Sequence, residues 1–379
     1  MIAIVESGTL DYAPEYSAYM PWITPLPNGC FIASQHVGSG LGTNDCRIEI
    51  LRSPDERQWH NEGQIVDQCS NYSYRMSQIH VLPDGRLLMT ATRFACNDVQ
   101  LFDPESEALQ QPQMLLYLSE DLGIRWSKPQ ILTVELPPDR YTANGAGILL
   151  QLTYGRWMYP FETWKPEGYC GPPDQKAGAL FSSNDGQTWD EWSIVADDPS
   201  NQLCYWDQMC TQLADGRIYT MLWVHHYGTS EDASDHYVLS VDKGQTWSLP
   251  AATNLKGQVC CPIALADGSV AAIYNYRREP QGIRVVLSED LKHFVNVLTV
   301  FDASSEATLG QSQSDNFLAE HLLIAFGKPG GLQLPDGDIL VWYLCTVKRR
   351  YTHALGTLAT SVSLASNAPH SDLRKRAEW

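Results

Sequence analysis

Three features of the sequence predict an all-β fold, a six-bladed β-propeller with four antiparallel strands in each blade. A short box motif recurs, a series of Asp-Gly turns runs in step with it, and no long amphipathic helical pattern interrupts them. Short strands at regular spacing with turn signals between them are typical of propellers. We therefore expect residues 1–379 to form a single propeller domain.

The box motif follows the template S-x-D-x-G-x-T-W. Three segments fit it well and two are one residue short, namely SEDLGIRW (119–126), SSNDGQTW (182–189), SVDKGQTW (240–247), SPDERQW (53–59) and SEDLKHF (288–294). In such a turn the Asp accepts backbone N–H groups, the Gly takes the strained position, and the Trp packs between strands. We expect the boxes to fasten the blades and to lie away from the functional site.

The second series consists of six turns between apolar runs that suit strands. They are LPNG (26–29), LPDG (82–85), LTYG (152–155), LADG (213–216), LADG (265–268) and LPDG (334–337). Asp-Gly between apolar runs is the strongest short hairpin signal. Each hairpin begins a unit of 50 to 70 residues. The sixth unit lacks a box, and we expect the N-terminal strand around MIAIVES (1–7) to complete it and close the ring.

Composition limits the function classes. The net charge is −18, which argues against nucleic acid or an acidic membrane surface as partner. The chain holds 12 Trp and 18 Tyr, a density often found where carbohydrate binds. The N-terminus has no basic region, Glu6 interrupts its apolar run, and no stretch is long enough to span a membrane, so we expect a cytoplasmic protein.

The sequence gives no sign of a metal or a cofactor. Ten Cys occur at irregular spacing without a CxxC pair, and we expect them to be reduced and mostly buried. No dinucleotide fingerprint, P-loop or Ser-His-Asp signature lies on suitable elements. The oligomeric state is left open.

The boxes and hairpins together resemble the Asp-box (BNR-repeat) sialidase superfamily over almost the whole chain. The segment GAGILLQLTYGRWMYP (145–160) is similar to its third-blade signature. Sialidase catalytic positions differ, however. Tyr19 stands at the place of the first-blade arginine, Asp207 replaces a Glu, Trp223 replaces an Arg, and GKPGGLQLPDG (327–337) lacks the nucleophilic Tyr. Related exo-glycosidases of this fold, such as exo-arabinanases, use two carboxylates instead.

The register of the repeats, with the resemblance, places candidate residues at one end of the ring. Asp207 and Glu162 are the candidate catalytic acid and base, since glycoside hydrolysis uses two carboxyl groups. Further residues expected at this end of the ring are the candidate substrate-binding residues, namely Arg75, Arg93, Asp45, Asp98, Trp164, His225, Arg277, His321 and Tyr343. Cations gathered in an acidic protein favour an anionic ligand, because guanidinium groups match carboxylates. The structural alternative for each is a solvated charge, an ion pair or a packed side chain.

Three functions are consistent with these features. The first is a sialidase-like exo-acting glycoside hydrolase that releases a terminal acidic sugar from an oligosaccharide. The second is a lyase acting on a uronate, in which an Arg neutralises the carboxylate and a His or Tyr abstracts the α proton. The third is a non-catalytic sugar-binding propeller.

Overall fold

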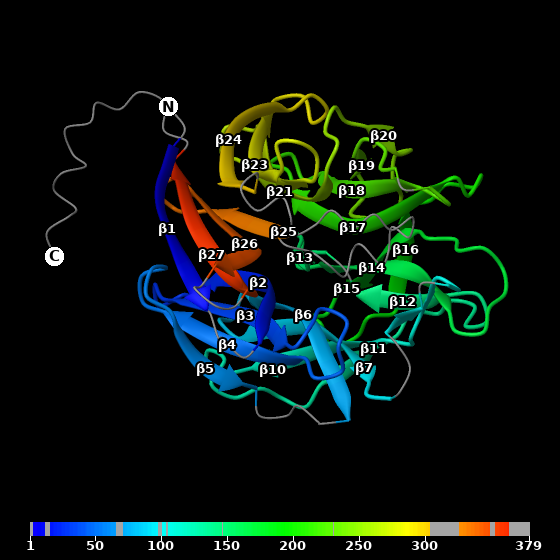
Figure 1. Cartoon of the computed structure of the whole chain (residues 1–379), viewed down its shortest axis with the longest axis horizontal. Helices are drawn as coiled ribbons and strands as arrows, with labels where there is room; N and C mark the ends of the chain where they lie inside the picture. The colour runs from blue at the N-terminus through cyan, green and yellow to red at the C-terminus, as the bar shows by residue number, and fades with distance from the viewer. Residues whose placement is uncertain are drawn as a thin grey trace, which may run out of the picture.

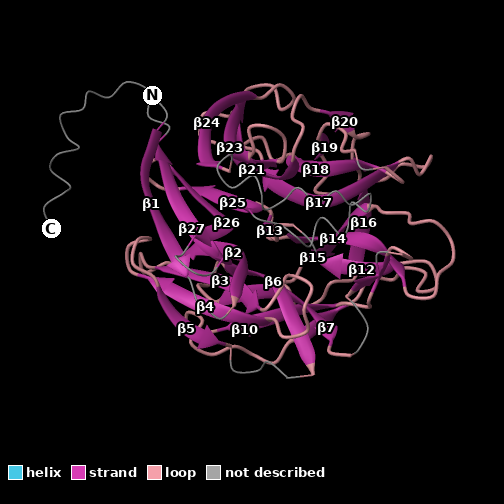
Figure 2. Ribbon diagram, viewed as in Figure 1, coloured by secondary structure: helices cyan, strands magenta, loops and turns pink. Residues whose placement is uncertain are grey.

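The structure is a computed structural model, which describes residues 3–11, 16–65, 71–97, 101–103, 105–145, 147–229, 231–303, 326–348 and 353–363. Every regular element in these ranges is a β-strand, and the strands form six sheets arranged as a ring (Figure 1, Figure 2). The predicted six-bladed propeller is confirmed. Nothing helical in the described ranges has the length and apolar character needed to cross a membrane.

Five blades are four-stranded antiparallel sheets, in which the first strand lies nearest the ring axis. Blade one contains β2 (Ser17–Pro25), β3 (Phe31–Gly38), β4 (Arg47–Ser53) and β5 (His60–Gln64). Blade two contains β6 (Tyr72–Val81), β7 (Leu87–Ala95), β10 (Gln113–Ser119) and β11 (Gln130–Leu132). Blade four contains β17 (Leu203–Gln212), β18 (Ile218–His226), β19 (His236–Ser240) and β20 (Ala251–Ala252). Blade five contains β21 (Gln258–Ala264), β22 (Val270–Tyr276), β23 (Gly282–Ser288) and β24 (Val295–Asp302).

Blade three is larger because its sheet takes in an insertion. Its axial side is split into β12 (Thr142–Gly145) and β13 (Leu150–Gln151), which both pair with β14 (Trp157–Pro166). The sheet continues to β15 (Ala177–Ser182) and β16 (Glu191–Ala196). The short strands β8 (Phe102–Asp103) and β9 (Ala108–Leu109) form a hairpin, and β9 runs parallel to the end of β14.

Blade six joins the two ends of the chain. It consists of β25 (Phe326–Gln333), β26 (Ile339–Lys348), β27 (His353–Ser363) and the N-terminal β1 (Ala3–Asp11). β1 pairs antiparallel with β27, and the two lie side by side in Figure 1. The prediction that the N-terminal strand closes the ring is therefore confirmed.

The hairpins and boxes have the predicted local chemistry. All six hairpin glycines have positive φ, between 74° and 93°. In the box at 240–247, the Asp242 carboxylate accepts the Thr246 N–H at 2.8 Å. Gly244 has φ 84°, and a Cβ there would meet Phe181 of blade three at 2.4 Å. The box thus packs its turn against the preceding blade, and only glycine permits that approach.

The antiparallel order separates the boxes from the other end of the ring. Each first strand ends at its glycine-containing hairpin, and the second strand returns to the opposite end of the ring. In blades one to five the third strand then leads to a box at the hairpin end. The starts of the first strands and the ends of the second strands lie together at the opposite end.

Four first strands carry the same irregularity near their starts. In β2, β6, β17 and β25 two residues oppose one residue of the next strand. Each bulge holds one residue with a positive φ, namely Met20 (50°), Met76 (54°), Asp207 (45°) and Lys328 (44°). Left-handed φ is unfavourable for residues with a Cβ, and bulges re-aim side chains beside functional sites. All four side chains line one cavity.

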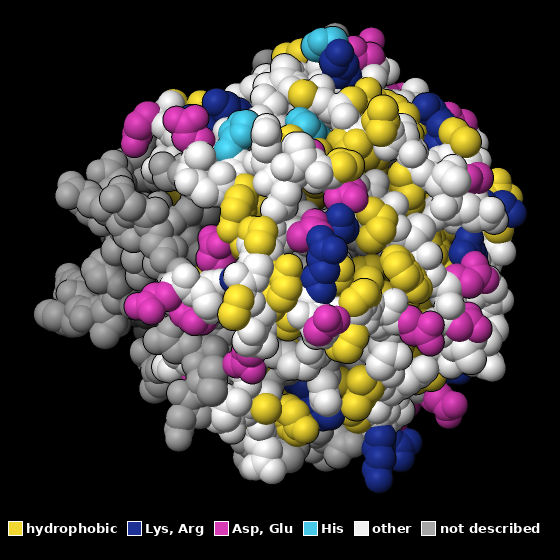
Figure 3. Space-filling view, turned by 90° about the vertical axis from the view of Figure 1, so that its right-hand side faces the viewer, with side chains coloured by type: hydrophobic (Ala, Val, Ile, Leu, Met, Phe, Trp, Pro, Cys, Tyr) yellow, Lys and Arg dark blue, Asp and Glu magenta, His cyan; other side chains and the backbone are white. Residues whose placement is uncertain are grey.

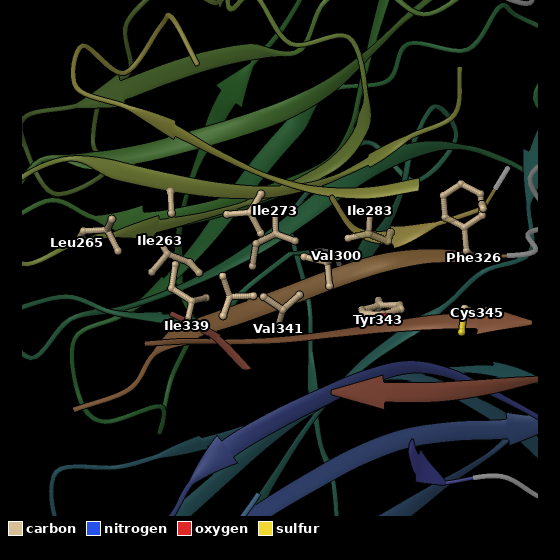
Figure 4. Packing of buried hydrophobic residues seen from close by; sticks show 14 residues of the cluster. Ile263, Leu265, Ile273, Ile283, Val300, Phe326, Ile339, Val341, Tyr343 and Cys345 are labelled. Carbon is tan, nitrogen blue, oxygen red and sulfur yellow. The ribbon is translucent and has the colours of Figure 1, made fainter. Parts of the chain in front are cut away.

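Adjacent blades bury apolar side chains between their faces. Figure 4 shows the cluster between blades five and six, in which Ile263, Ile273 and Ile283 face Ile339 and Val341. Tyr343 belongs to this cluster with 2% of its surface exposed, and its ring lies 5.7 Å from that of Phe301. Tyr343 is thus a core residue, contrary to its predicted place at the site face, because its side chain points between the blades.

Candidate functional site

A cavity of about 170 Å³ lies where the first strands begin. A cavity of about 150 Å³ holds one benzene-sized ring, so this one admits one ring of a ligand. Half of its described lining is apolar, comprising Met20, Leu41, Met76, Phe94, Leu101, Phe102, Leu109 and Trp164. The other half is polar, comprising Arg75, Asn144, Glu162, Asp207, Gln258, Asn275, Arg277 and Lys328.

The two predicted carboxylates meet in this cavity. β14 carries Glu162, which is 4% exposed, and the bulge of β17 carries Asp207. The Asp207 backbone N–H donates to Glu162 Oε1, and the Trp164 indole N–H donates to Glu162 Oε2 at 3.1 Å. Lys328 Nζ donates to Asp207 Oδ1 across the axis from blade six. The two strained bulges therefore bring a carboxylate and an ammonium group together beside a second carboxyl group.

Their surroundings separate the two carboxyl groups chemically. Burial and, to a lesser extent, the nearby Asp207 carboxylate raise the pKa of Glu162, Lys328 opposes them, and the resulting pKa is about 8. Glu162 therefore holds its proton at neutral pH. Asp207 faces the Lys328 ammonium, an arrangement suited to a carboxylate. A protonated carboxylic acid beside a second carboxyl group that is paired with an ammonium group is an arrangement that general acid catalysis can use.

Two guanidinium groups also reach the cavity. Arg75 is 5% exposed, and its Nη2 donates to the Thr43 carbonyl at 2.5 Å and to Ser73 Oγ at 3.2 Å. Arg277 donates from Nε to Gln258 Oε1 at 3.2 Å. Within the described ranges neither guanidinium forms a salt bridge with a carboxylate. Both cations are therefore available to an anionic group of a ligand.

Three buried polar atoms of the lining have no hydrogen-bond partner within the described part of the chain. They are Asn144 Oδ1, Asn275 Oδ1 and Arg75 Nε. Buried polar groups are nearly always hydrogen-bonded, so unmet atoms in a cavity mark where a ligand or water binds. The amide oxygens accept hydroxyl groups and the guanidinium donates, a set that suits a hydroxylated anionic ligand.

A hydrogen-bonded chain supports Arg277 from behind. Asp232 accepts from Gln258 Nε2 at 3.1 Å and from the Trp223 indole at 2.9 Å, and it contacts His225 Nδ1 at 3.0 Å. Gln258 in turn accepts from Arg277. Asp232 thus fixes the amide that holds the guanidinium.

His225 lies in this support and not in the cavity. It is 4% exposed, its Nε2 contacts the Thr229 carbonyl at 2.9 Å, and its ring stacks on Trp206 at 5.5 Å. The next residue, His226, is exposed, whereas His225 points inward and both of its ring nitrogens are already engaged. Its predicted contact with substrate is not supported by this position.

Two further predicted binding residues lie away from the cavity. Arg93 donates to Gln113 at 2.7 Å and covers the Tyr72 ring at 4.0 Å. Asp45 accepts from the Ser39 N–H at 3.0 Å and from Thr43 Oγ1 at 2.5 Å, so it shapes its own loop. Asp98 and His321 lie outside the described residues.

The cavity thus gathers Glu162, Asp207, Arg75, Trp164 and Arg277 from the predicted set. Its amides, Asn144, Gln258 and Asn275, were missed. The register of the repeats also does not predict that Lys328 pairs with Asp207. The insertion residues of the apolar side were also missed, because nothing in an apolar dipeptide such as Leu101-Phe102 distinguishes a cavity wall from a core.

The ring of six blades and the carboxyl-bearing axial cavity define a sialidase-like propeller. The model of the BNR repeat-like domain matches residues 30–321, and the chain belongs to this family. Comparison with curated proteins gave no sequence match.

Solved structures share the fold at low identity. A Dyadobacter fermentans protein described as of unknown function superposes with a TM-score of 0.75 at 18% identity, covering 96% of this chain and 99% of that one. The Penicillium chrysogenum α-L-arabinanase complexed with arabinobiose gives 0.65 at 14% identity, covering 95% and 98%. The Trypanosoma rangeli sialidase gives 0.62 at 14% identity, covering 91% of this chain and 55% of the sialidase.

Proposed function

We propose that this protein is an exo-acting glycoside hydrolase that releases a terminal acidic sugar. The observation that carries the proposal is the carboxyl pair of the cavity, in which protonated Glu162 lies against the Asp207–Lys328 ion pair. The cavity admits one ring, which is consistent with a terminal residue as the unit bound. The solved relatives named a sialidase and an arabinanase support a glycosidase on this scaffold, although fold alone does not fix activity.

The chemistry follows from the state of each group. Glu162 donates its proton to the glycosidic oxygen as the bond between that oxygen and the anomeric carbon breaks, and the leaving group departs as an alcohol. The Asp207 carboxylate stabilises the positive charge that develops at the anomeric carbon. The oxygen of a water molecule then bonds to that carbon, and the water proton returns to a carboxylate of the pair.

The preference for an acidic sugar rests on Arg75 and Arg277. Each is a cavity guanidinium without a carboxylate salt bridge in the described part of the chain. A ligand carboxylate meets that charge through charge-assisted hydrogen bonds. On the face of the molecule seen in Figure 3, acidic and basic side chains are interspersed.

The test is a release assay on oligosaccharides ending in acidic and neutral sugars, with Glu162→Gln, Asp207→Asn and the control Glu49→Gln. Glu49 is also buried, at 5% exposure, but pairs with Arg47 at 2.8 Å outside the cavity. We expect release of an acidic sugar by wild type and the control, and loss in both cavity variants. Unchanged turnover in both cavity variants would contradict the assignment.

The same assay separates the other two functions. A lyase product carries a C=C bond that absorbs in the ultraviolet. The lyase reaction also needs a base, a His or Tyr, that abstracts the α proton of the uronate. No His or Tyr occurs among the described lining residues, so the hydrolase is favoured. Binding of an acidic sugar without release of any product would identify a non-catalytic binding propeller.

A further inference from the structure

The two halves of the cavity lining come from different parts of the ring. All eight apolar lining residues come from blades one to three and from the 101–109 insertion. Seven of the eight polar lining residues come from blades three to six, with Arg75 as the exception. The cavity therefore has an apolar wall and a polar wall that meet at β14, the strand that carries both Glu162 and Trp164.

Glu162 marks where the scissile bond lies between these walls. One carboxyl oxygen of Glu162 accepts from Asp207 on the polar side, and the other accepts from Trp164 on the apolar side. Because the general acid protonates the leaving-group oxygen, one half of the substrate lies along each wall. The sugar hydroxyls and the carboxylate need the amides and Arg277, so the sugar takes the polar wall. The leaving group then lies against Trp164 and its neighbours.

Five of the eight apolar lining residues form one cluster. Phe94, Phe102 and Leu109 are buried together, with Leu101 and Trp164 packed against them. The Phe102 ring meets Trp164 at 6.0 Å and 76°, and Trp206 covers one face of the indole at 5.9 Å and 6°. Trp164 is therefore not an open platform on which a sugar ring stacks. A sugar in the leaving-group position would lose its hydroxyl hydrogen bonds to water without finding partners on this wall.

We propose, resting on the hydrolase function above, that the natural substrate is a glycoside of an apolar alcohol, in which an alkyl or aryl aglycone occupies the apolar wall. Such a substrate is a conjugate of an acidic sugar with a lipophilic hydroxyl compound, in contrast to a polysaccharide. Hydrolysis yields the free sugar and the alcohol ROH, with the hydroxyl proton supplied by Glu162.

The experiment measures binding of the product class directly, by ligand-observed NMR titration with ethanol, 1-butanol and 1-hexanol. Each added methylene on the wall is expected to lower the dissociation constant about fourfold in wild type. Leu101→Asn should remove this chain-length dependence. Leu332→Asn is the matched control, since Leu332 is likewise a half-buried leucine but lines the cavity at the hairpin end of the axis. Leu41→Asn, in a separate loop of the wall, repeats the test if Leu101→Asn does not fold.

Equal dissociation constants for ethanol and 1-hexanol, undetectable binding of 1-hexanol, or loss of the chain-length dependence in Leu332→Asn alone would each overturn the proposal. A parallel assay compares methyl and hexyl glycosides of the same acidic sugars. Chain-length-dependent alcohol binding without hydrolysis of either glycoside would retain the apolar subsite and refute the hydrolase. Hydrolysis of both glycosides at equal kcat/KM, with no chain-length dependence in binding, would retain the hydrolase and refute the apolar aglycone.

Discussion

Glu162 and Asp235 are both buried carboxyl groups whose pKa burial raises to about 8. Glu162 lines the axial cavity and lies beside Asp207 and Lys328. Asp235 is 0% exposed in blade four and accepts from the Cys260 thiol at 3.2 Å, away from the cavity lining. The same electrostatic shift thus occurs once where a ligand can reach it and once where none can. A raised pKa identifies a candidate acid only together with access and a charged partner.

The largest expected difference between the two groups is in turnover. Glu162→Gln removes the transferable proton and keeps the shape, so release of the acidic sugar should fall about 10²–10⁴-fold. Asp235→Asn replaces a carboxylic acid that is already neutral and should leave kcat/KM within about twofold of wild type. Equal losses in the two variants would remove the distinction between them.

Substrate affinity extends the comparison to the arginines. Arg277→Gln deletes a charge-assisted hydrogen bond worth about 1.5–3 kcal/mol, so KM for an acidic sugar should rise by roughly one to two orders of magnitude. Arg93→Gln is the control, because Arg93 covers Tyr72 away from the cavity. A neutral analogue of the sugar should show no such rise in KM. An equal rise for the acidic and neutral sugars would indicate lost structure instead of lost charge recognition.

The pH dependence of kcat/KM should also distinguish Glu162 from Asp235. Glu162 must be protonated to act, so kcat/KM should fall tenfold per pH unit above about pH 8. Asp235→Asn should keep this alkaline limb, and the residual activity of Glu162→Gln should lack it. If the alkaline limb disappeared in Asp235→Asn, it would report Asp235 and not Glu162, which would contradict the assignment.

The smallest expected effect is on the pH dependence of the free energy of unfolding, to which Glu162 and Asp235 should contribute equally. In the folded state both groups are mostly protonated at pH 7 and about half protonated at pH 8, whereas both are ionised in the unfolded state. The native state therefore binds more protons over this range, and the free energy of unfolding falls as pH rises. Each group contributes at most about 1.4 kcal/mol per pH unit. Chemical denaturation at pH 7 and 8 should show about half the wild-type slope in either single variant. A slope unchanged in Asp235→Asn would contradict its raised pKa.

Much of the fold could be predicted because its signals are local. Each Asp-Gly hairpin and each box is fixed by a few adjacent residues, and counting them gave both the ring and its closure by β1. The register of these turns then placed Glu162 and Asp207 at one end of the ring.

The rest of the site depends on geometry that the repeat does not encode. The bulges that aim Asp207 and Lys328 at each other break the two-residue period of a strand, and no turn residue announces them. Register alone also cannot decide which face of a strand a side chain takes, as Tyr343 in the core and His225 against Trp206 illustrate. The apolar wall depends on an insertion outside the repeat.

The central claim is that the Glu162 carboxyl group in the cavity is protonated at neutral pH. Carbon-13 NMR of protein labelled at the Glu and Asp carboxyl carbons tests it without a known substrate. We expect one Glu and one Asp resonance to titrate near pH 8, with the Glu resonance missing in Glu162→Gln and retained in Asp235→Asn. A Glu162 resonance that titrates near its ordinary value of about 4.3 would contradict the account.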